Sequence, residues 1–254
     1  IYTFIRQRYD EGDFDPYYEL RKNSTAQALT YLDRLRTTVR TSSHRLETAV
    51  KVAAAGNIVD FAALGHRGFD MAAEIQRIEQ LHFAIFDVEQ LRSLLDSAST
   101  ILYIGDNAGE TVFDRVLVEE LASSYPNARR VYAVRGGPIV NDATLEDARD
   151  AGLDTVAELI SNGNSYPGTV LEETCREFRD VFDAADVIVA KGQGNFETLS
   201  SIADSRLVFA LRVKCDCVAR HTGAPKGSLV LWNAGHTNPL PGNHGAPHAQ
   251  KEQP

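Results

Sequence analysis

The 254-residue sequence is poor in cysteine and methionine, and it has no long apolar run. Its cysteines, Cys175, Cys215 and Cys217, are too few for a disulfide framework and have the wrong spacing for a Cys-x-x-Cys pair, which favours a reducing compartment. No apolar stretch approaches the length of a transmembrane helix, and no signal peptide is recognisable. We therefore expect a cytoplasmic protein with no membrane partner.

Positive charge is also scarce, because 26 Lys and Arg residues stand against 35 Asp and Glu residues, for a net charge of −9. Since the basic residues form no cluster, the sequence does not indicate a nucleic-acid partner. Lysine is the rarer base, and it occurs only at positions 22, 51, 191, 214, 226 and 251. A single lysine can still serve a phosphate site, so each of these positions is a candidate for one.

The chain begins at Ile1, and its one methionine is Met71. We therefore expect further N-terminal residues to precede it in the natural protein. The length, with 43% hydrophobic residues, suffices for one large α/β domain or for a core domain with a helical subdomain.

The first part of the chain shows helical periodicity and no strand pattern. Asp15 and Pro16 are typical of a helix start, and leucines recur at helical spacing from there to Val39. Further helices are predicted over 44–56, 69–81 and 88–95. We therefore predict a helical N-terminal subdomain over residues 1–97.

The second part alternates short β-branched runs with amphipathic helices. The predicted strands are 100–104, 130–134, 155–160, 185–190, 207–213 and 228–232, and the helix after the third strand is expected to begin near Thr169. This alternation indicates a three-layer α/β/α sandwich with a mostly parallel sheet. We predict an α/β catalytic domain over 98–232 and a disordered tail over 233–254, which is rich in Pro, Gly, Asn and His.

Four of the predicted strands end in loops of glycine and polar residues. The loop residues of interest are Asp106, Asn107 and Glu110 after the first strand, Asp142 after the second, Ser161 and Gly163 after the third, and Lys191 and Asn195 after the fourth. Because the carboxyl ends of parallel strands meet at one edge of a sheet, we expect these loops to form one rim. Two carboxylates and an amide oxygen suit Mg²⁺ or Mn²⁺, and a lysine beside a glycine-rich loop suits a phosphate.

Each loop also has a simpler interpretation when it is taken alone. Asp106, Asn107 or Asp142 could cap the helix that follows, and the loop at 161–169 could be an ordinary solvated loop. Asn57 and Asp60 are three residues apart on a predicted helix, and by spacing alone they favour a helix junction. The predicted convergence of the four loops favours a site.

In combination, four motifs resemble the DUF89, or ARMT1-like, family of metal-dependent damage-control phosphatases. In chain order they are Gly56-Asn57-Ile58-Val59-Asp60, Gly105-Asp106-Asn107-Ala108-Gly109-Glu110, residues 137–144 and residues 191–197. The resemblance covers residues 15–232 and implies a helical region before an α/β/α sandwich. It also implies that Asp106, Asn107 and Asp142 hold the metal, that Lys191 and Glu110 lie near the substrate, and that Asn57 and Asp60 approach the site. Similar members carry cysteines in an N-terminal segment absent here, so the chain resembles a truncated member.

The expected reaction is hydrolysis of a small phosphate monoester, such as a sugar phosphate or a damaged phosphometabolite, with Mn²⁺ or Mg²⁺ as cofactor and Co²⁺ or Ni²⁺ as further candidates. The expected catalytic residues are Asp106, Glu110, Lys191 and Asp60, and the expected substrate-binding residues are Asn57, Ser161, Gly163, Lys191 and Asn195. Metal-activated water is favoured over attack by Asp106, because Ala108 stands where a haloacid-dehalogenase pattern would have a second Asp.

Two alternatives from other functional classes stay open. A carboxyl methyltransferase would bind S-adenosylmethionine at Gly105 to Gly109, but that turn keeps only two glycines and places acidic side chains where the cofactor would lie. A metal- or phosphometabolite-binding module without turnover is the other. The sequence predicts no particular oligomeric state.

Overall fold

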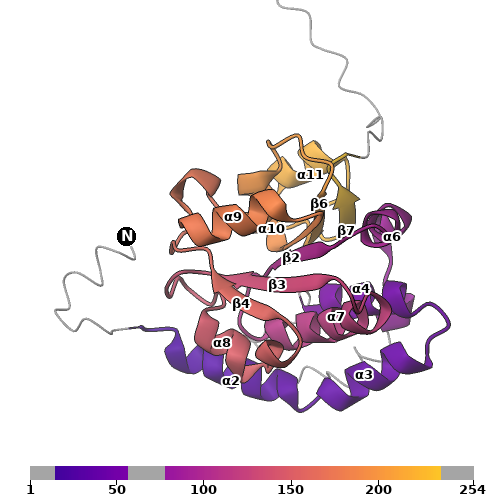
Figure 1. Ribbon diagram of the computed structural model, residues 1–254, viewed down its shortest axis with the longest axis horizontal. Helices are drawn as coiled ribbons and strands as arrows, with labels where there is room; N and C mark the ends of the chain where they lie inside the picture. The colour runs from indigo at the N-terminus through magenta and orange to yellow at the C-terminus, as the bar shows by residue number, and fades with distance from the viewer. Residues whose placement is uncertain (1–14, 57–77, 236–254) are drawn as a thin grey trace, which may run out of the picture.

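A seven-stranded sheet forms the middle layer of the protein, between two layers of helices (Figure 1). The computed structural model describes residues 15–56 and 78–235. The strands are β1 (Phe83–Phe86), β2 (Thr100–Ile104), β3 (Arg129–Val134), β4 (Glu158–Ser161), β5 (Val187–Lys191), β6 (Leu207–Arg212) and β7 (Leu229–Asn233). Their order in the sheet is β1-β7-β6-β5-β2-β3-β4, and β2 to β6 run parallel. Strand β7 is antiparallel to β6, and β1 is parallel to β7.

The helices cover both faces of the sheet. One layer contains α2 (Tyr18–Leu29), α3 (Leu32–Thr41), α4 (Arg45–Gly56), α6 (Val88–Leu95), α7 (Glu110–Ser124) and α8 (Leu145–Asp150). The opposite layer contains α9 (Arg176–Ala184), α10 (Gly192–Leu199) and α11 (Asp216–Thr222). Three short 3-10 turns, η1 (Ile78–Gln80), η2 (Leu153–Thr155) and η3 (Leu171–Glu173), lie in the connections. The predicted three-layer α/β/α sandwich with a helical N-terminal part is confirmed.

Alternating side chains of the central strand divide the core in two. Ile101 and Tyr103 of β2 belong to the cluster beneath α4 and α7, whereas Leu102 and Ile104 belong to the cluster beneath α9 and α10. A strand that is buried on both faces reads as a continuous apolar run, which is how β2 appears in the sequence. Since β2 lies between β5 and β3, the turn that follows it sits in the middle of the carboxyl edge.

The N-terminal part differs from the sequence prediction in three places. Of the predicted helix 69–81, residues 69–77 lie outside the described residues, and Ile78–Gln80 forms the 3-10 turn η1 instead of an α-helix. The first predicted helix is two helices, because α2 ends before Thr30, whose hydroxyl donates to the carbonyl oxygen of Gln27, and α3 begins at Leu32. Strand β1 was not predicted, since four residues are too few to show a period, and pairing with β7 stabilises it. The domain boundary at residue 97 stays a prediction, and so does the division into a helical subdomain and an α/β catalytic domain.

Later element boundaries also differ from the predicted ones. Strand β4 begins at Glu158 rather than at residue 155, because Leu153–Thr155 forms the 3-10 turn η2. Helix α9 begins at Arg176, since the backbone N–H of Cys175 donates to Asn162 and keeps that residue out of the helix. Strand β7 includes Asn233, the first residue of the predicted tail; residues 236–254 lie outside the described part of the chain. Within residues 15–56 and 78–235, no helix has the length and apolar character needed to span a membrane.

Candidate functional site

The turns after β2 and β3 are joined to each other at the carboxyl edge of the sheet. Asn107 and Asp142 form an isolated antiparallel bridge. Beside it, the N–H of Ala143 donates to the carbonyl oxygen of Asp106 at 2.8 Å, and the N–H of Ala108 donates to the carbonyl oxygen of Asn141 at 3.0 Å. The two turns therefore hold their polar side chains in a fixed relation.

The turn after β3 contains a strained residue. Val140 has φ 49°, and it is the one non-glycine residue with positive φ in residues 15–56 and 78–235. A β-branched side chain is disfavoured in this region of backbone space, and such strain is often found near functional sites. The strained position lies two residues before Asp142, in the turn that bridges to Asn107.

Asp106, Glu110 and Asp142 bring three largely buried carboxylates to this edge, with 8%, 4% and 9% of each residue exposed. The side-chain amide of Asn107 links two of them: Nδ2 donates to Asp106 Oδ2 at 3.1 Å and to Glu110 Oε1 at 2.7 Å. Both amide hydrogens of Asn107 are thus used, while no hydrogen bond from the described residues reaches its Oδ1. The predicted metal ligands Asp106, Asn107 and Asp142 therefore lie together.

Burial makes these carboxylates costly to ionise. It raises the pKa of Asp106 to about 6, with a further contribution from the charge of Asp142. It raises the pKa of Glu110 to about 7, although the nearby ammonium of Lys191 acts in the opposite direction. The pKa of Asp142 is raised by burial against the opposing charge of Arg135. A bound cation would stabilise the ionised form of these carboxylates and lower their pKa values.

Arg135 is the main site residue that the sequence analysis did not select. Its guanidinium is buried, with Nε 2.7 Å from Asp142 Oδ2 and Nη2 3.5 Å from Asp106 Oδ1. Nη1 donates to Thr169 Oγ1 at 3.2 Å and to Asn195 Oδ1 at 3.0 Å. The available signal was its position directly after β3, which corresponds to the position of Gly105 after β2.

Asn195, which was predicted to bind substrate, is fully buried on α10. Its side-chain amide hydrogen-bonds to residues at the ends of β2, β3 and β5. Its Oδ1 accepts from Arg135 and from Thr169, at 3.0 and 2.9 Å. Its Nδ2 donates to the carbonyl oxygens of Gly105 and Lys191, at 3.1 and 2.7 Å. These four bonds use the full capacity of the amide, so Asn195 faces protein on every polar atom.

Lys191 ends β5 and is fully buried beneath Glu110. Its ammonium lies 2.8 Å from Asp114 Oδ1, 3.0 Å from the carbonyl oxygen of Ala53 and 3.4 Å from Glu110 Oε2. The structure thus brings Lys191 to the predicted cluster, but on its protein side. Asp114 was not selected from the sequence; the available signal was its spacing of one helical turn from Glu110.

The predicted phosphate loop, residues 161–169, is hydrogen-bonded to the turn after β3. Asn162 Oδ1 accepts from the backbone N–H groups of Gly136 and Asn164, both at 3.1 Å. Ser161 Oγ accepts from the N–H of Gly163 at 3.0 Å, so that amide serves the loop itself. The loop lies beside the rim, and its contact with a phosphate stays a prediction. Asn57 and Asp60 lie outside the described residues.

A third cation, Lys214, also acts on these carboxylates, after Arg135 and Lys191. Lys214 follows β6 and is exposed, and its charge is among the causes that lower the pKa of Asp106 and of Asp142, against the larger effect of burial. Its backbone N–H is held by Gln193 Oε1 at 2.8 Å. Among the five lysines that lie in the described residues, Lys214 therefore combines exposure with a charge effect on both Asp106 and Asp142.

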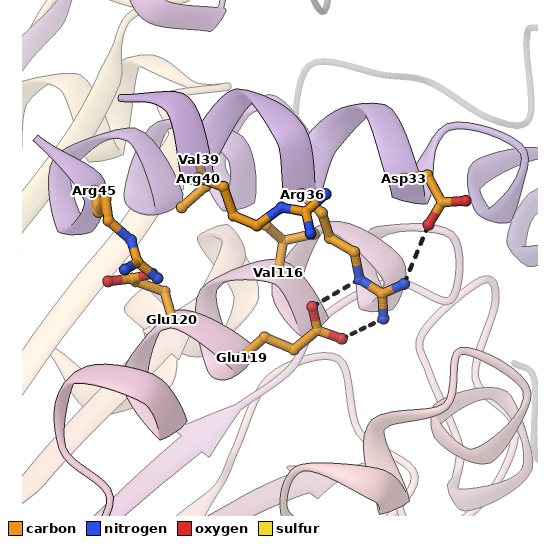
Figure 2. Close-up of a pocket in the computed structure, with 8 residues that line it drawn as sticks. All are labelled: Asp33, Arg36, Val39, Arg40, Arg45, Val116, Glu119 and Glu120. Carbon is orange, nitrogen blue, oxygen red and sulfur yellow. Dashed lines mark hydrogen bonds and ion pairs between the residues drawn. The ribbon is translucent and has the colours of Figure 1, made fainter. Parts of the chain in front are cut away.

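A pocket of about 340 Å³ lies away from this edge, between α3, α4 and α7 (Figure 2). Its lining residues are Asp33, Arg36, Val39, Arg40, Arg45, Val116, Glu119 and Glu120. Arg36 binds Glu119 through Nε and Nη2 at 2.8 and 2.6 Å, and Arg45 Nη2 lies 2.6 Å from Glu120. Glu119 and Glu120 of α7 are therefore neutralised by α3 and α4, which is typical of an ion-paired helix junction.

Comparison with known proteins assigns the family. The family model described as damage-control phosphatase ARMT1-like domain matches residues 1–230. The chain belongs to this family. The predicted DUF89 or ARMT1-like membership is thereby confirmed, and it supports a phosphatase function.

Two relatives and one solved structure show how far the similarity extends within the family. A damage-control phosphatase of Pyrococcus horikoshii is 41% identical over 230 residues, covering 91% of this chain and 76% of that protein. A damage-control phosphatase of Archaeoglobus fulgidus is 36% identical over 233 residues, covering 90% and 80%. The crystal structure of a DUF89 family protein from P. horikoshii matches with a TM-score of 0.81 at 39% identity, covering 91% of this chain and 79% of that one.

Proposed function

We propose that the protein is a divalent-metal-dependent phosphatase that hydrolyses small phosphate monoesters, such as sugar phosphates or damaged phosphometabolites. The observation that carries this proposal is the meeting of Asp106, Asn107 and Asp142 at the middle of the carboxyl edge, where the bridge between Asn107 and Asp142 joins two turns. Membership in the damage-control phosphatase family supports the reaction class.

The donor set suits a hard divalent ion. Asp106 and Asp142 offer carboxylate oxygens and Asn107 offers an amide oxygen, which are the ligands that Mg²⁺ and Mn²⁺ prefer. Within the described ranges, no group of three or more His, Cys, Asp or Glu side chains is arranged to hold a metal, so the proposed set depends on the amide of Asn107. Co²⁺ and Ni²⁺ remain further candidates, since they also accept oxygen ligands.

The chain's own residues divide the remaining tasks. A divalent ion bound here supplies polarisation of the phosphoryl oxygens and a more acidic bound water. Lys214, which is exposed and whose charge acts on Asp106, binds the incoming phosphate and balances its charge. Glu110, whose pKa is raised to about 7 by burial, can hold or release a proton near neutral pH. Arg135 holds Asp142 through Nε and keeps its carboxylate oriented.

The test is phosphate release from p-nitrophenyl phosphate and from a panel of sugar phosphates, with EDTA or with added Mg²⁺, Mn²⁺, Co²⁺ or Ni²⁺. Asp106→Ala and Asp142→Ala are compared with the natural protein, and Asp154→Ala, which changes an exposed carboxylate on η2, is the matched control. Circular dichroism establishes that each variant is folded.

We expect metal-dependent turnover that both site variants abolish and the control retains. Turnover that survives EDTA, or that survives both site substitutions, would contradict the proposal. Metal binding without turnover of any substrate would instead favour a binding module, and methyl transfer from S-adenosylmethionine would favour the methyltransferase alternative.

A further inference from the structure

Asp114 is a completely buried carboxylate beneath the candidate site. It lies on α7 one turn after Glu110, so the two side chains share a face of the helix. Its Oδ1 accepts from Tyr103 Oη at 2.7 Å and from Lys191 Nζ at 2.8 Å, and its Oδ2 accepts from Tyr132 Oη at 2.8 Å. The three donors come from β2, β5 and β3, the three adjacent strands in the centre of the sheet.

The ammonium of Lys191 has no free donor in this arrangement. Its three hydrogens match three acceptors, which are Asp114, Glu110 and the carbonyl oxygen of Ala53. Burial lowers the pKa of Lys191, but the charges of Asp114 and Glu110 outweigh that effect and raise it, so the side chain stays a cation. In the described part of the chain, all three hydrogens of the Lys191 ammonium are therefore directed to protein acceptors.

Tyr132, which donates a hydrogen bond to Asp114, also packs against the turn that carries Asp106. A Cβ atom on Gly105 would lie 2.4 Å from Tyr132 Oη, so this hydroxyl packs directly against the backbone of Gly105. Tyr103 stacks on Tyr132 with ring centroids 5.2 Å apart. Burial, reinforced by the charge of Asp114, raises the pKa of both phenols well above the usual value, so both hydroxyls remain donors.

We propose that Asp114 is a positioning residue, which fixes the Lys191 ammonium beside Glu110 and the Tyr132 hydroxyl beneath Gly105. Asp114 does not touch the substrate. It sets the position of the two elements that carry Glu110 and Asp106, and it holds the buried ammonium of Lys191 beside Glu110. The activity part of its test rests on the proposed phosphatase function, whereas the metal-binding part does not.

Asp114→Asn preserves the shape of the side chain but removes its charge and turns one acceptor into a donor. The matched control is Glu120→Gln, which neutralises another largely buried carboxylate on α7 that binds Arg45 rather than the site. Lys191→Met and the double variant show whether Asp114 acts through Lys191. The full chain is used throughout, with kcat and KM measured and Mn²⁺ affinity determined on metal-stripped protein by electron paramagnetic resonance.

Asp114→Asn should lower kcat by about 10- to 100-fold with little change in KM, and should weaken Mn²⁺ binding by about 10-fold, as is typical when a group that orients metal ligands is changed. Glu120→Gln should leave both quantities close to those of the natural protein. Since Asp114 acts partly through Lys191, the loss in kcat of the double variant should be smaller than the product of the two single losses. Natural kcat and Mn²⁺ affinity in a folded Asp114→Asn variant, or single losses that multiply in full, would overturn the proposal.

Two further arms keep the test decisive. If Asp114→Asn does not fold, Tyr132→Phe removes only the hydroxyl between Asp114 and Gly105, and unchanged Mn²⁺ affinity in that variant would overturn the proposal. If the natural protein turns over no phosphate ester, the proposed function fails, and Mn²⁺ affinity alone decides: weaker binding by Asp114→Asn supports the positioning role, and equal binding refutes it.

Discussion

Gly192 lies so close to Asp106 that a Cβ atom at position 192 would be 1.9 Å from Asp106 Oδ2. Gly192 opens α10 directly after Lys191 and has φ 80°, a backbone conformation that side chains rarely adopt. The two residues belong to turns after neighbouring strands, β5 and β2. The absence of a side chain at position 192 is therefore what leaves room for the carboxylate of Asp106.

Gly192→Ala should displace Asp106 and remove metal-dependent activity. Gly227→Ala is the matched control, because Gly227 has φ 91° and a Cβ atom there would meet nothing within 4 Å. The control should lower the free energy of unfolding by about 1 kcal/mol through backbone strain alone. Gly192→Ala should cost more, and only this variant should lose metal-induced stabilisation in a thermal melt. Equal losses in the two variants would contradict the close approach.

Arg135→Met should strongly destabilise the metal-free protein. Removal of the guanidinium leaves the buried carboxylates of Asp142 and Asp106 without their counter-charge, at a cost of about 3 kcal/mol in the free energy of unfolding. Arg129→Met, which breaks an exposed pair with Glu158, should cost less than about 1 kcal/mol. Urea unfolding in EDTA measures both changes. We expect added Mn²⁺ to stabilise Arg135→Met more than the natural protein, since a cation replaces the lost charge.

The stability of the metal-free protein should fall as pH rises from about 4.5 to about 7. Burial raises the pKa of Glu110 to about 7, so the folded state keeps a proton that the unfolded state releases near pH 4.5. A carboxyl whose pKa is raised by folding contributes stability at low pH, and this contribution is lost as pH passes through the raised value. Its size is of the order of 3 kcal/mol.

Glu110→Gln should remove the part of that pH dependence that Glu110 contributes, and leave the part contributed by Asp106 and Asp142, whose pKa values burial also raises. Urea unfolding in EDTA at several pH values compares the variant with the natural protein. The same slope in both proteins would show that Glu110 ionises normally in the folded state.

Lys214→Gln should weaken substrate binding with little effect on stability. The side chain is exposed, so the melting temperature should stay unchanged, while loss of a charge-assisted bond to the phosphate should raise KM about 10-fold. Lys226→Gln is the control, because its ammonium is also exposed but pairs with Asp216 at 3.6 Å. A KM that responds equally to both substitutions would indicate only a general effect of charge.

Val140→Gly should stabilise the protein. The side chain is 41% exposed and its backbone has φ 49°, so glycine relieves strain while little apolar burial is lost. The expected gain is about 1 kcal/mol in the free energy of unfolding. If activity falls while stability rises, the strained turn also serves to place Asp142. A loss of stability would show that Val140 is not strained in solution.

The sequence predicted the layers of the fold and the turns of the site, because both follow from patterns along short stretches. Strand β2 is an apolar run that ends in a glycine, and the acidic residues follow it directly. Parallel strands place such ends on one edge, which was enough to gather Asp106 and Asp142. Strand β1 escaped prediction because its stability comes from pairing with β7, far along the chain.

The direction in which a side chain points could not be predicted from the sequence. Lys191 was predicted to lie near the substrate because it ends a strand at the functional edge, and its sequence position does not reveal that its ammonium points to Asp114 and Ala53. Arg135 reads as part of a glycine-rich loop, but it lies buried between two carboxylates. In both residues the orientation depends on charges from other elements, which no local pattern contains.

The order of the strands also has a kinetic consequence. Lys191 and Asp114 are 77 residues apart in the sequence, and they meet only when β5 has paired with β2. Contacts between distant parts of a chain form late in folding, because the intervening loop must be closed first. During refolding, we therefore expect the ability to bind a metal ion to appear after the helices have formed. Its appearance should report when β5 pairs with β2 in the sheet.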